Sequence, residues 1–203
     1  MLGAMECVDY DGQLMLRYGH GDIRAFEALY ARHKDGLYRY LLRHVRNAAV
    51  ASDLFQEVWS RVIAARARYT ARAKFTTFLF HIAHNCTIDY HRRQLATPIR
   101  FAADTSAEPI GEAAGPDHER PDRRAEYDQQ QAALLSALAA LPAEQREAFL
   151  LREESGLGVE EIAKITSVGV ETAKSRLRYA VRKLKRSLGE ELVPPARVRA
   201  GAV

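Results

Sequence analysis

An acidic segment that contains prolines and glycines divides this chain of 203 residues into two parts. Between Asp104 and Asp128 there are eight acidic and only three basic side chains, a net charge of −5, and large apolar residues are nearly absent. Such a stretch lacks the apolar surface that folding requires, so we expect an extended linker between two small domains. The predicted parts are an N-terminal tail (1–19), a first domain (20–95), the linker (96–126), a second domain (127–190) and a C-terminal tail (191–203).

Apolar residues on both sides of the linker recur at helical spacing, which predicts an all-α fold. In the first domain we expect helices over 22–45 and 76–93. Between them we expect a helix that Ser52 or Asp53 caps, with Gln56 completing a capping box. The helices expected in the second domain are 127–141, 142–155, 159–165 and 170–188.

The composition limits the classes of function. The net charge is only +4, and 47% of the residues are hydrophobic, as in globular proteins. No run of about 18 apolar residues is present, so we expect a soluble chain with no membrane insertion and no secretion signal. The two cysteines cannot form a disulfide framework, and we expect no metal and no cofactor.

His81, His84 and Cys86 raise the alternative of a metal-dependent enzyme, with Asp89 as a further ligand. On a helix His81 and His84 can share a face, but Cys86 lies roughly 140° away from His81. A structural zinc site normally needs four well-placed ligands, and the sequence has neither a phosphate-binding glycine loop nor a His-Glu-x-x-His helix. We therefore favour ordinary surface or partly buried side chains.

Basic and aromatic side chains alternate around the last helix of the first domain. They are Tyr69, Lys74, Phe75, Thr76 and Thr77 in a loop, and Asn85, Asp89, Arg92 and Arg93 on the helix that follows. Cations that follow phosphates and rings that stack on unpaired bases are typical of single-stranded nucleic acid binding. Composition alone favours the simpler interpretation, a solvated basic helix end that complements the helix dipole.

A short helix, a tight turn at 166–169 and a basic helix form the pattern of a helix-turn-helix unit. Seven basic and no acidic side chains lie between Thr172 and Gly189, which argues against a helix that has no ligand. In such units the residues near the start of the second helix face base edges, whereas others reach phosphates. The expected base-facing residues are Glu171, Thr172, Lys174, Ser175 and Arg178, with Tyr179 close by, and the expected phosphate contacts are Arg176, Arg182 and Lys183.

Two signatures in this order, covering about 20–95 and 128–188, resemble one known family. The first consists of Asp53-Leu54-Phe55-Gln56-Glu57-Val58, Phe75-Thr76-Thr77-Phe78-Leu79-Phe80-His81-Ile82-Ala83-His84-Asn85 and Ile88-Asp89-Tyr90-His91-Arg92-Arg93. The second consists of Leu141-Pro142-Ala143-Glu144-Gln145-Arg146, Glu161-Ile162-Ala163 and Glu171-Thr172-Ala173-Lys174-Ser175-Arg176-Leu177. Together they are similar to the extracytoplasmic-function (ECF) group of bacterial RNA polymerase sigma factors.

The resemblance implies a cytoplasmic bacterial transcription initiation factor that is not itself an enzyme. Its partners would be core RNA polymerase, promoter DNA both as duplex and as melted single strand, and an anti-sigma factor or a regulatory kinase. The first domain would be sigma region 2, which binds polymerase and captures the melted minus-10 strand, and the second would be sigma region 4, which reads the minus-35 duplex. The implied polymerase-binding residues are Asp53, Leu54, Gln56 and Glu57. The acidic linker would then thread the polymerase channel that later holds RNA.

One position departs from the family pattern. Members usually carry an acidic run where this chain has Val50-Ala51-Ser52-Asp53, so two carboxylates that would meet basic polymerase residues are missing. One hypothesis is that phosphorylation of Ser52 restores roughly −1.5 to −2 of charge at a helix N-terminus. The simpler interpretation, which we favour, is that Ser52 is only an N-cap.

The nearest alternative function is that of a polymerase-independent helix-turn-helix transcription factor. Such a protein binds duplex DNA and needs no surface on which unpaired bases stack. The loop of aromatic and basic residues in the first domain argues against it.

Overall fold

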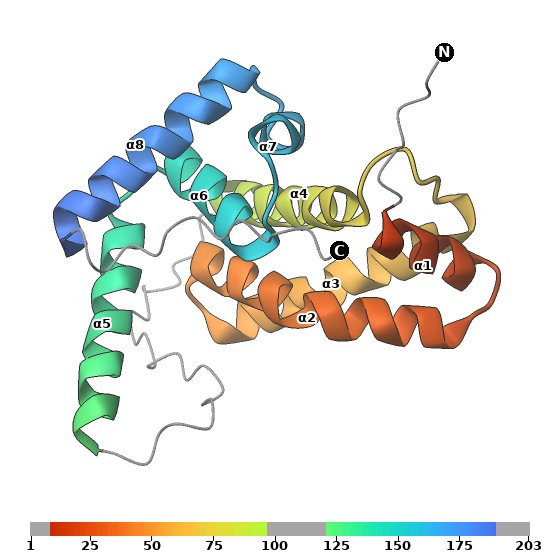
Figure 1. Cartoon of the computed structure of the whole chain (residues 1–203), viewed down its shortest axis with the longest axis horizontal. Helices are drawn as coiled ribbons and strands as arrows, with labels where there is room; N and C mark the ends of the chain where they lie inside the picture. The colour runs from red at the N-terminus through yellow and green to blue at the C-terminus, as the bar shows by residue number, and fades with distance from the viewer. Residues whose placement is uncertain (1–8, 97–120, 190–203) are drawn as a thin grey trace. The chain divides into compact units, whose positions relative to one another are not determined.

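The computed structural model describes residues 9–96 and 121–189, with the side chains of 121–128 outside that description. Every element within these ranges is helical, and the helices form two compact units, α1–α4 and α5–α8, which confirms the predicted fold class (Figure 1). No helix within the described ranges is long and apolar enough to cross a membrane. Most of the predicted linker and the whole predicted C-terminal tail lie outside the described residues.

The observed helices agree with the expected ones over most of their length. The first unit contains α1 (Tyr10–Gly19), α2 (Ile23–Val45), α3 (Ala48–Ala65), the short 3-10 helix η1 (Arg66–Arg68) and α4 (Phe75–Ala96). The second contains α5 (Pro121–Ala139), α6 (Ala143–Ser155), α7 (Val159–Ile165) and α8 (Val170–Leu188). The start of α5 is a correction, because residues 121–126 were assigned to the linker and are helical.

The helix α1 is a correction, because the sequence analysis assigned residues 1–19 to a tail. Asp9 caps this helix by accepting a hydrogen bond from the Gly12 N–H at 3.0 Å. Leu14 and Met15 are buried and attach α1 to its unit. The signal was present in the sequence as an Asp N-cap followed by apolar residues.

The start of α3 is a further correction. The helix begins at Ala48, so Ser52 and Asp53 lie inside it and neither is its N-cap. The residues before Ser52 are mostly alanines, which have the highest helix propensity and continue the helix upstream. A phosphate on Ser52 would therefore stand in the second turn of α3, beyond the first turn where the helix dipole acts most strongly.

A cluster of aromatic side chains packs between α2 and α3 around Trp59. The ring of Trp59 lies 5.7 Å from that of Phe26 and 5.1 Å from that of Tyr30, centroid to centroid. Trp59 is almost completely buried, whereas Tyr30 remains at the surface. The Phe26–Trp59 pair is packed edge to face, an arrangement that contributes about 0.5–1.5 kcal/mol beyond the burial of its area.

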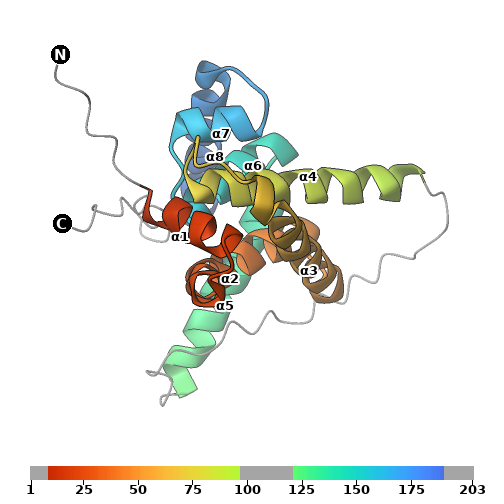
Figure 2. The same cartoon turned by 90° about the vertical axis from the view of Figure 1, so that its right-hand side faces the viewer.

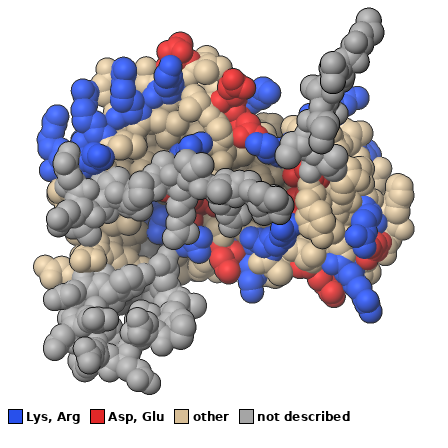
Figure 3. Space-filling view, viewed as in Figure 1, with Lys and Arg blue, Asp and Glu red and all other residues tan. Residues whose placement is uncertain are grey.

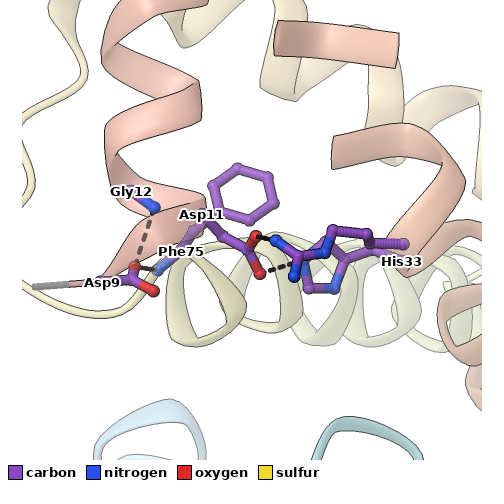
Figure 4. Close-up of polar contacts among 6 residues, drawn as sticks. Asp9, Asp11, Gly12, His33 and Phe75 are labelled. Carbon is purple, nitrogen blue, oxygen red and sulfur yellow. Dashed lines mark hydrogen bonds and ion pairs between the residues drawn. The ribbon is translucent and has the colours of Figure 1, made fainter. Parts of the chain in front are cut away.

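A half-buried carboxylate joins α1 to α2. Asp11 pairs with the Arg32 guanidinium at 2.5 Å and with Nε2 of His33 at 2.9 Å (Figure 4). The hydrogen bond from His33, with the charge of Arg32 added to it, holds the pKa of Asp11 below its ordinary value. Asp11 therefore stabilises the first unit above its ordinary pKa, and that contribution is lost as the pH falls through the lowered value.

We expect Asp11→Asn to lower the free energy of unfolding of the first unit by about 1 kcal/mol near neutral pH. The difference between variant and wild type should shrink as the pH falls through the lowered pKa of Asp11, because the carboxyl is then protonated in both the folded and the unfolded state. Urea unfolding followed by fluorescence of Trp59, the chain's one tryptophan, reports on this unit. The exposed Asp35→Asn on α2 is the control and should change little; a difference that persists in acid would contradict the account.

Candidate nucleic-acid interface

The turn between α7 and α8 sets the direction of the basic helix α8 relative to the shorter helix α7. The Val168 N–H donates to the Ala163 carbonyl at 3.0 Å, and the Ser167 N–H donates to the Lys164 carbonyl at 3.4 Å. Ser167 adopts the left-handed conformation, with φ of 53°. Together these features form a Schellman motif, which ends α7 after Ile165 and lets α8 begin at Val170.

One face of α8 is buried and the opposite face is basic. Ala173, Ala180 and Leu184 are buried, and Leu177 between them is half-buried. The small alanines allow α6 and α7 to approach closely, as Ala163 does from the other side. Figure 3 shows the row of Lys and Arg side chains that follows α8. The helix-turn-helix geometry predicted from the sequence is thus present.

The predicted duplex contacts occupy the accessible part of α8. Ser175 and Arg176 are half-buried, whereas the others are exposed, namely Glu171, Thr172, Lys174, Arg178, Tyr179 and Arg182. Lys183 is also exposed, but its ammonium donates to the Ala140 carbonyl at 3.0 Å, just after the end of α5. Its predicted phosphate contact stays a prediction, and the described contact gives its ammonium a backbone partner within the protein.

Two guanidinium groups are held by one aromatic ring. The Arg182 guanidinium carbon lies 4.8 Å from the centroid of the Tyr179 ring, and that of Arg178 lies 5.4 Å away. Cation–π contacts of this kind limit the positions of long side chains. Tyr179 therefore orders two of the predicted contacts.

The second unit also has a groove between α6 and α8 that the sequence analysis did not identify. It encloses about 700 Å³, with Phe149, Leu177 and Val181 among its lining residues. Arg152 and Lys185 are among the basic residues that border it. The groove thus combines apolar and cationic surface.

In the first unit, α4 presents a polar stripe along one side. His81, Asn85, Ile88 and Arg92 are exposed and follow each other at spacings of four, three and four residues, so they share a face. Ile88 is the one apolar side chain in this stripe and is 39% exposed. The end of α4 projects past α1–α3, and every residue in 91–96 is exposed (Figure 2).

The loop before α4 and the first turn of that helix are only partly accessible, which corrects some of the predicted contacts. Phe75, Thr76 and Thr77, which were predicted to lie in the loop, belong to α4. Phe75 is completely buried and Thr77 is 9% exposed, so neither side chain can meet a nucleic acid in this conformation. Lys74 is exposed and Thr76 is half-buried. Tyr69 packs its ring 5.1 Å from that of Phe78, and its hydroxyl is buried without a hydrogen-bond partner.

Charged side chains join the end of α4 to α3. Arg61 lies 2.5 Å from a Glu57 oxygen and 3.6 Å from Asp89, and Arg93 reaches the other Glu57 oxygen at 3.8 Å. Glu57, a predicted polymerase contact, therefore borders Asp89 and Arg93, which are predicted nucleic-acid contacts. Of the other predicted polymerase contacts on α3, Asp53 and Gln56 are exposed, but Leu54 is buried in the core.

The residues of the metal-enzyme alternative do not converge. His81 is exposed, whereas Cys86 is completely buried on the opposite side of α4. Burial raises the pKa of the Cys86 thiol to about 11, which disfavours the thiolate that a metal requires. In residues 9–96 and 121–189 no three His, Cys, Asp or Glu side chains are grouped so as to hold a metal ion.

Three residues near the interface were missed as contacts by the sequence analysis. His81 was considered only as a metal ligand, although its spacing of four from Asn85 signals the same helix face. Arg72 is exposed in the loop before α4. Arg61 joins α3 to α4, and only the fold reveals that contact.

Comparison with known families matches both units. The sigma-70 region 2 family matches residues 29–97, and the sigma-70 region 4 family matches residues 131–184. The RNA polymerase sigma factor CarQ of Myxococcus xanthus is 34% identical over 176 residues, which cover 87% of this chain and 96% of CarQ. The ECF RNA polymerase sigma factor SigL of Mycobacterium tuberculosis is 36% identical over 169 residues, covering 80% of this chain and 88% of SigL.

Solved structures share the fold at lower sequence identity. CnrH, solved in complex with the cytosolic domain of CnrY, superimposes with a TM-score of 0.63 at 22% identity, covering 89% of this chain and 98% of CnrH. RpoE of Bartonella quintana, solved with the anti-sigma factor NepR, gives 0.59 at 22% identity, covering 80% of this chain and 96% of that one. With both family matches and two relatives above 30% identity, the chain belongs to the sigma-70 family of RNA polymerase sigma factors, within its ECF group.

Proposed function

We propose that the protein directs core RNA polymerase to specific promoters by using its two units for two states of DNA. The second unit reads the minus-35 element as duplex through α8, and the first captures the minus-10 element as melted single strand along α4. The chain makes and breaks no bond itself, because catalysis belongs to the polymerase, and it acts in the bacterial cytoplasm where the polymerase works.

The observation that carries the duplex half of the proposal is the division of α8 into a buried face and a basic face. Ala173, Ala180 and Leu184 fix the orientation of the helix, so the side chains near its start point outward together. Lys174 and Arg178 are exposed and long enough to reach base edges, while Arg182 suits a phosphate. Direct base readout by the first turns of a recognition helix follows from this placement.

The exposed stripe of α4 supports the melted-strand half. Asn85 can hydrogen-bond an unpaired base edge, and Arg92 on the same face can hold phosphate or stack on a base. Lys74 at the end of the loop adds a further cation. Since Phe75 is in the core, stacking must come from other rings. The half-buried rings that keep some exposed surface are those of Tyr69 in the loop and of Phe78 and Tyr90 on α4.

The groove between α6 and α8 fits a regulatory partner. Two structural relatives were solved in complexes, one of them with an anti-sigma factor. A protein segment with apolar and acidic side chains would match the apolar lining and basic border of the groove. Because Arg178 and Arg182 also line it, an anti-sigma factor bound there would block duplex reading.

Reconstitution tests the proposed function. Purified chain and core RNA polymerase should form a complex on gel filtration, and together they should start transcripts at discrete promoters that core polymerase alone does not use. Binding of the chain to duplex DNA with no effect on polymerase would instead support the polymerase-independent transcription factor.

We expect Lys174→Ala and Arg178→Ala each to weaken holoenzyme binding to the minus-35 element by about 1–3 kcal/mol if they contact bases. The loss should shrink on minus-35 sequences in which the contacted base pair is changed. Lys183→Ala is a matched control on the same helix, because it removes the same charge from a side chain that faces α5. Unchanged sequence preference in both contact variants would reject the assignment.

Tyr179→Leu should weaken minus-35 binding by about 0.5–1 kcal/mol, because it removes the ring that orders Arg178 and Arg182. Tyr179→Phe keeps the ring face and should bind like wild type. A titration of the minus-35 duplex at constant salt measures both. If the Phe variant loses as much as the Leu variant, the hydroxyl rather than the ring face is responsible.

Phosphorylation of Ser52 stays a hypothesis. This residue is half-buried in the second turn of α3, where the helix dipole would stabilise a phosphate less than in the first turn. If added charge there replaces the missing carboxylates, Ser52→Glu should bind core polymerase more tightly than wild type, and Ser52→Ala should not. Polymerase affinity of the three proteins decides the point. No gain for the Glu variant would overturn the hypothesis.

A further inference from the structure

One carboxylate oxygen of Asp9 links two helices that are distant in sequence. Oδ2 of Asp9 accepts the Gly12 N–H at 3.0 Å, which caps α1, and the Phe75 N–H at 2.5 Å, which opens α4 (Figure 4). Asp9 and Phe75 are 66 positions apart. We call this pair of contacts the Asp9 bridge.

The start of α4 needs a partner from elsewhere in the chain. The first N–H groups of any helix have no acceptor within the helix, and a side-chain oxygen at the preceding position usually supplies one. Here the preceding residue is Lys74, and a lysine ammonium can only donate hydrogen bonds, so it cannot accept one from the helix N–H groups. The Asp9 bridge therefore supplies an acceptor that the local sequence does not.

Neighbouring contacts attach the same loop to α1. A Cβ placed on Gly12 would lie 2.9 Å from Asp9 Oδ2 and 3.4 Å from the Tyr69 hydroxyl, so only a glycine leaves room for this approach. Burial beside Asp9 and Asp11 raises the pKa of Tyr69 to about 12, so its hydroxyl stays protonated. The His33 ring, which contacts Asp11, also packs 5.3 Å from that of Phe75.

We propose that Asp9 is a positioning residue for the melted-strand site, because the Asp9 bridge holds the end of the loop and the first turn of α4 in the conformation that presents Lys74 and Thr76. The inference rests on the proposed function of that loop and goes beyond it, since Asp9 and α1 precede the matched region at residues 29–97. A loop that is already ordered loses less conformational entropy when it binds a strand. Asp9 thus contributes to strand capture without touching DNA.

Three substitutions separate the two halves of the Asp9 bridge. Asp9→Ala removes both contacts, and Asp9→Asn keeps an acceptor oxygen of the same reach. Asp9→Ser retains a good cap for α1, but its oxygen is one bond closer to the backbone and should not reach Phe75. Asp22→Ala is the matched control, because Asp22 accepts the Ala25 N–H at the start of α2, away from the loop.

The experiment uses the holoenzyme and two DNA probes. One is a fork junction with a single-stranded non-template minus-10 segment, and the other is a minus-35 duplex. Asp9→Ala and Asp9→Ser should bind the fork roughly three- to tenfold more weakly than wild type, while Asp9→Asn recovers most of the affinity. The minus-35 duplex should bind equally in all variants, and Asp22→Ala should leave the fork affinity unchanged.

Gly12→Ala provides a test that leaves the charge of Asp9 in place. Alanine inside a helix is normally more favourable than glycine by about 1 kcal/mol. At this position the added methyl group displaces the Asp9 carboxylate, so we expect weaker fork binding in the same direction as Asp9→Ser. Fork affinity at or above that of wild type would count against the Asp9 bridge.

The outcomes distinguish this inference from the proposed function. Arg92→Ala should weaken fork binding through direct contact. If Arg92→Ala weakens fork binding while Asp9→Ala and Asp9→Ser bind the fork like wild type, the positioning role of Asp9 is overturned. The proposed melted-strand site is then still supported. If neither Arg92→Ala nor the Asp9 variants change fork binding, the melted-strand site itself is wrong. Equal losses on the fork and on the minus-35 duplex would show general destabilisation and would also overturn the positioning role.

Discussion

The burial of one face of α4 and one face of α8 is the constraint on which the rest of the structure depends. Phe75, Leu79 and Ala83 are completely or almost completely buried, so α4 cannot rotate without exposing them. The same holds for α8 through Ala173 and Leu184. Since each helix is fixed in rotation by apolar burial, its polar side chains are presented as a defined row. Recognition of DNA is in this sense a consequence of packing.

Contacts between distant parts of the chain complete the first unit. Asp11 pairs with two side chains of α2, and the Asp9 bridge joins the start of α1 to the start of α4. Arg61 places Glu57 of α3 beside Asp89 of α4, so the surfaces proposed for polymerase and for the melted strand adjoin. The individual exposed ion pairs are weak, and their importance lies in where they put the side chains.

Local patterns predicted most of the fold but not the accessibility of each side chain. Helical periodicity gave α7 and α8 and the turn between them, because turn chemistry and apolar spacing are local properties. The alanines before Ser52 were not used as a helix signal, so the start of α3 was placed late. Phe75 was predicted as a stacking ring because its neighbours are basic, yet burial depends on α1 and α2, which no local window contains. Periodicity along α4 could have found His81, whereas the Asp9 bridge could not have been read from two segments so far apart.

Two footprints of one promoter complex test the central claim most directly. Permanganate reactivity reports unpaired thymines, and protection from nuclease reports contact with duplex DNA. With core polymerase and this chain together, minus-10 thymines should become reactive and the minus-35 element should be protected. A chain that carries both Asn85→Ala and Arg92→Ala should lose the reactive thymines and keep the minus-35 protection. Loss of both signals together, or reactive thymines without the chain, would contradict the assignment of melted and duplex DNA to separate units.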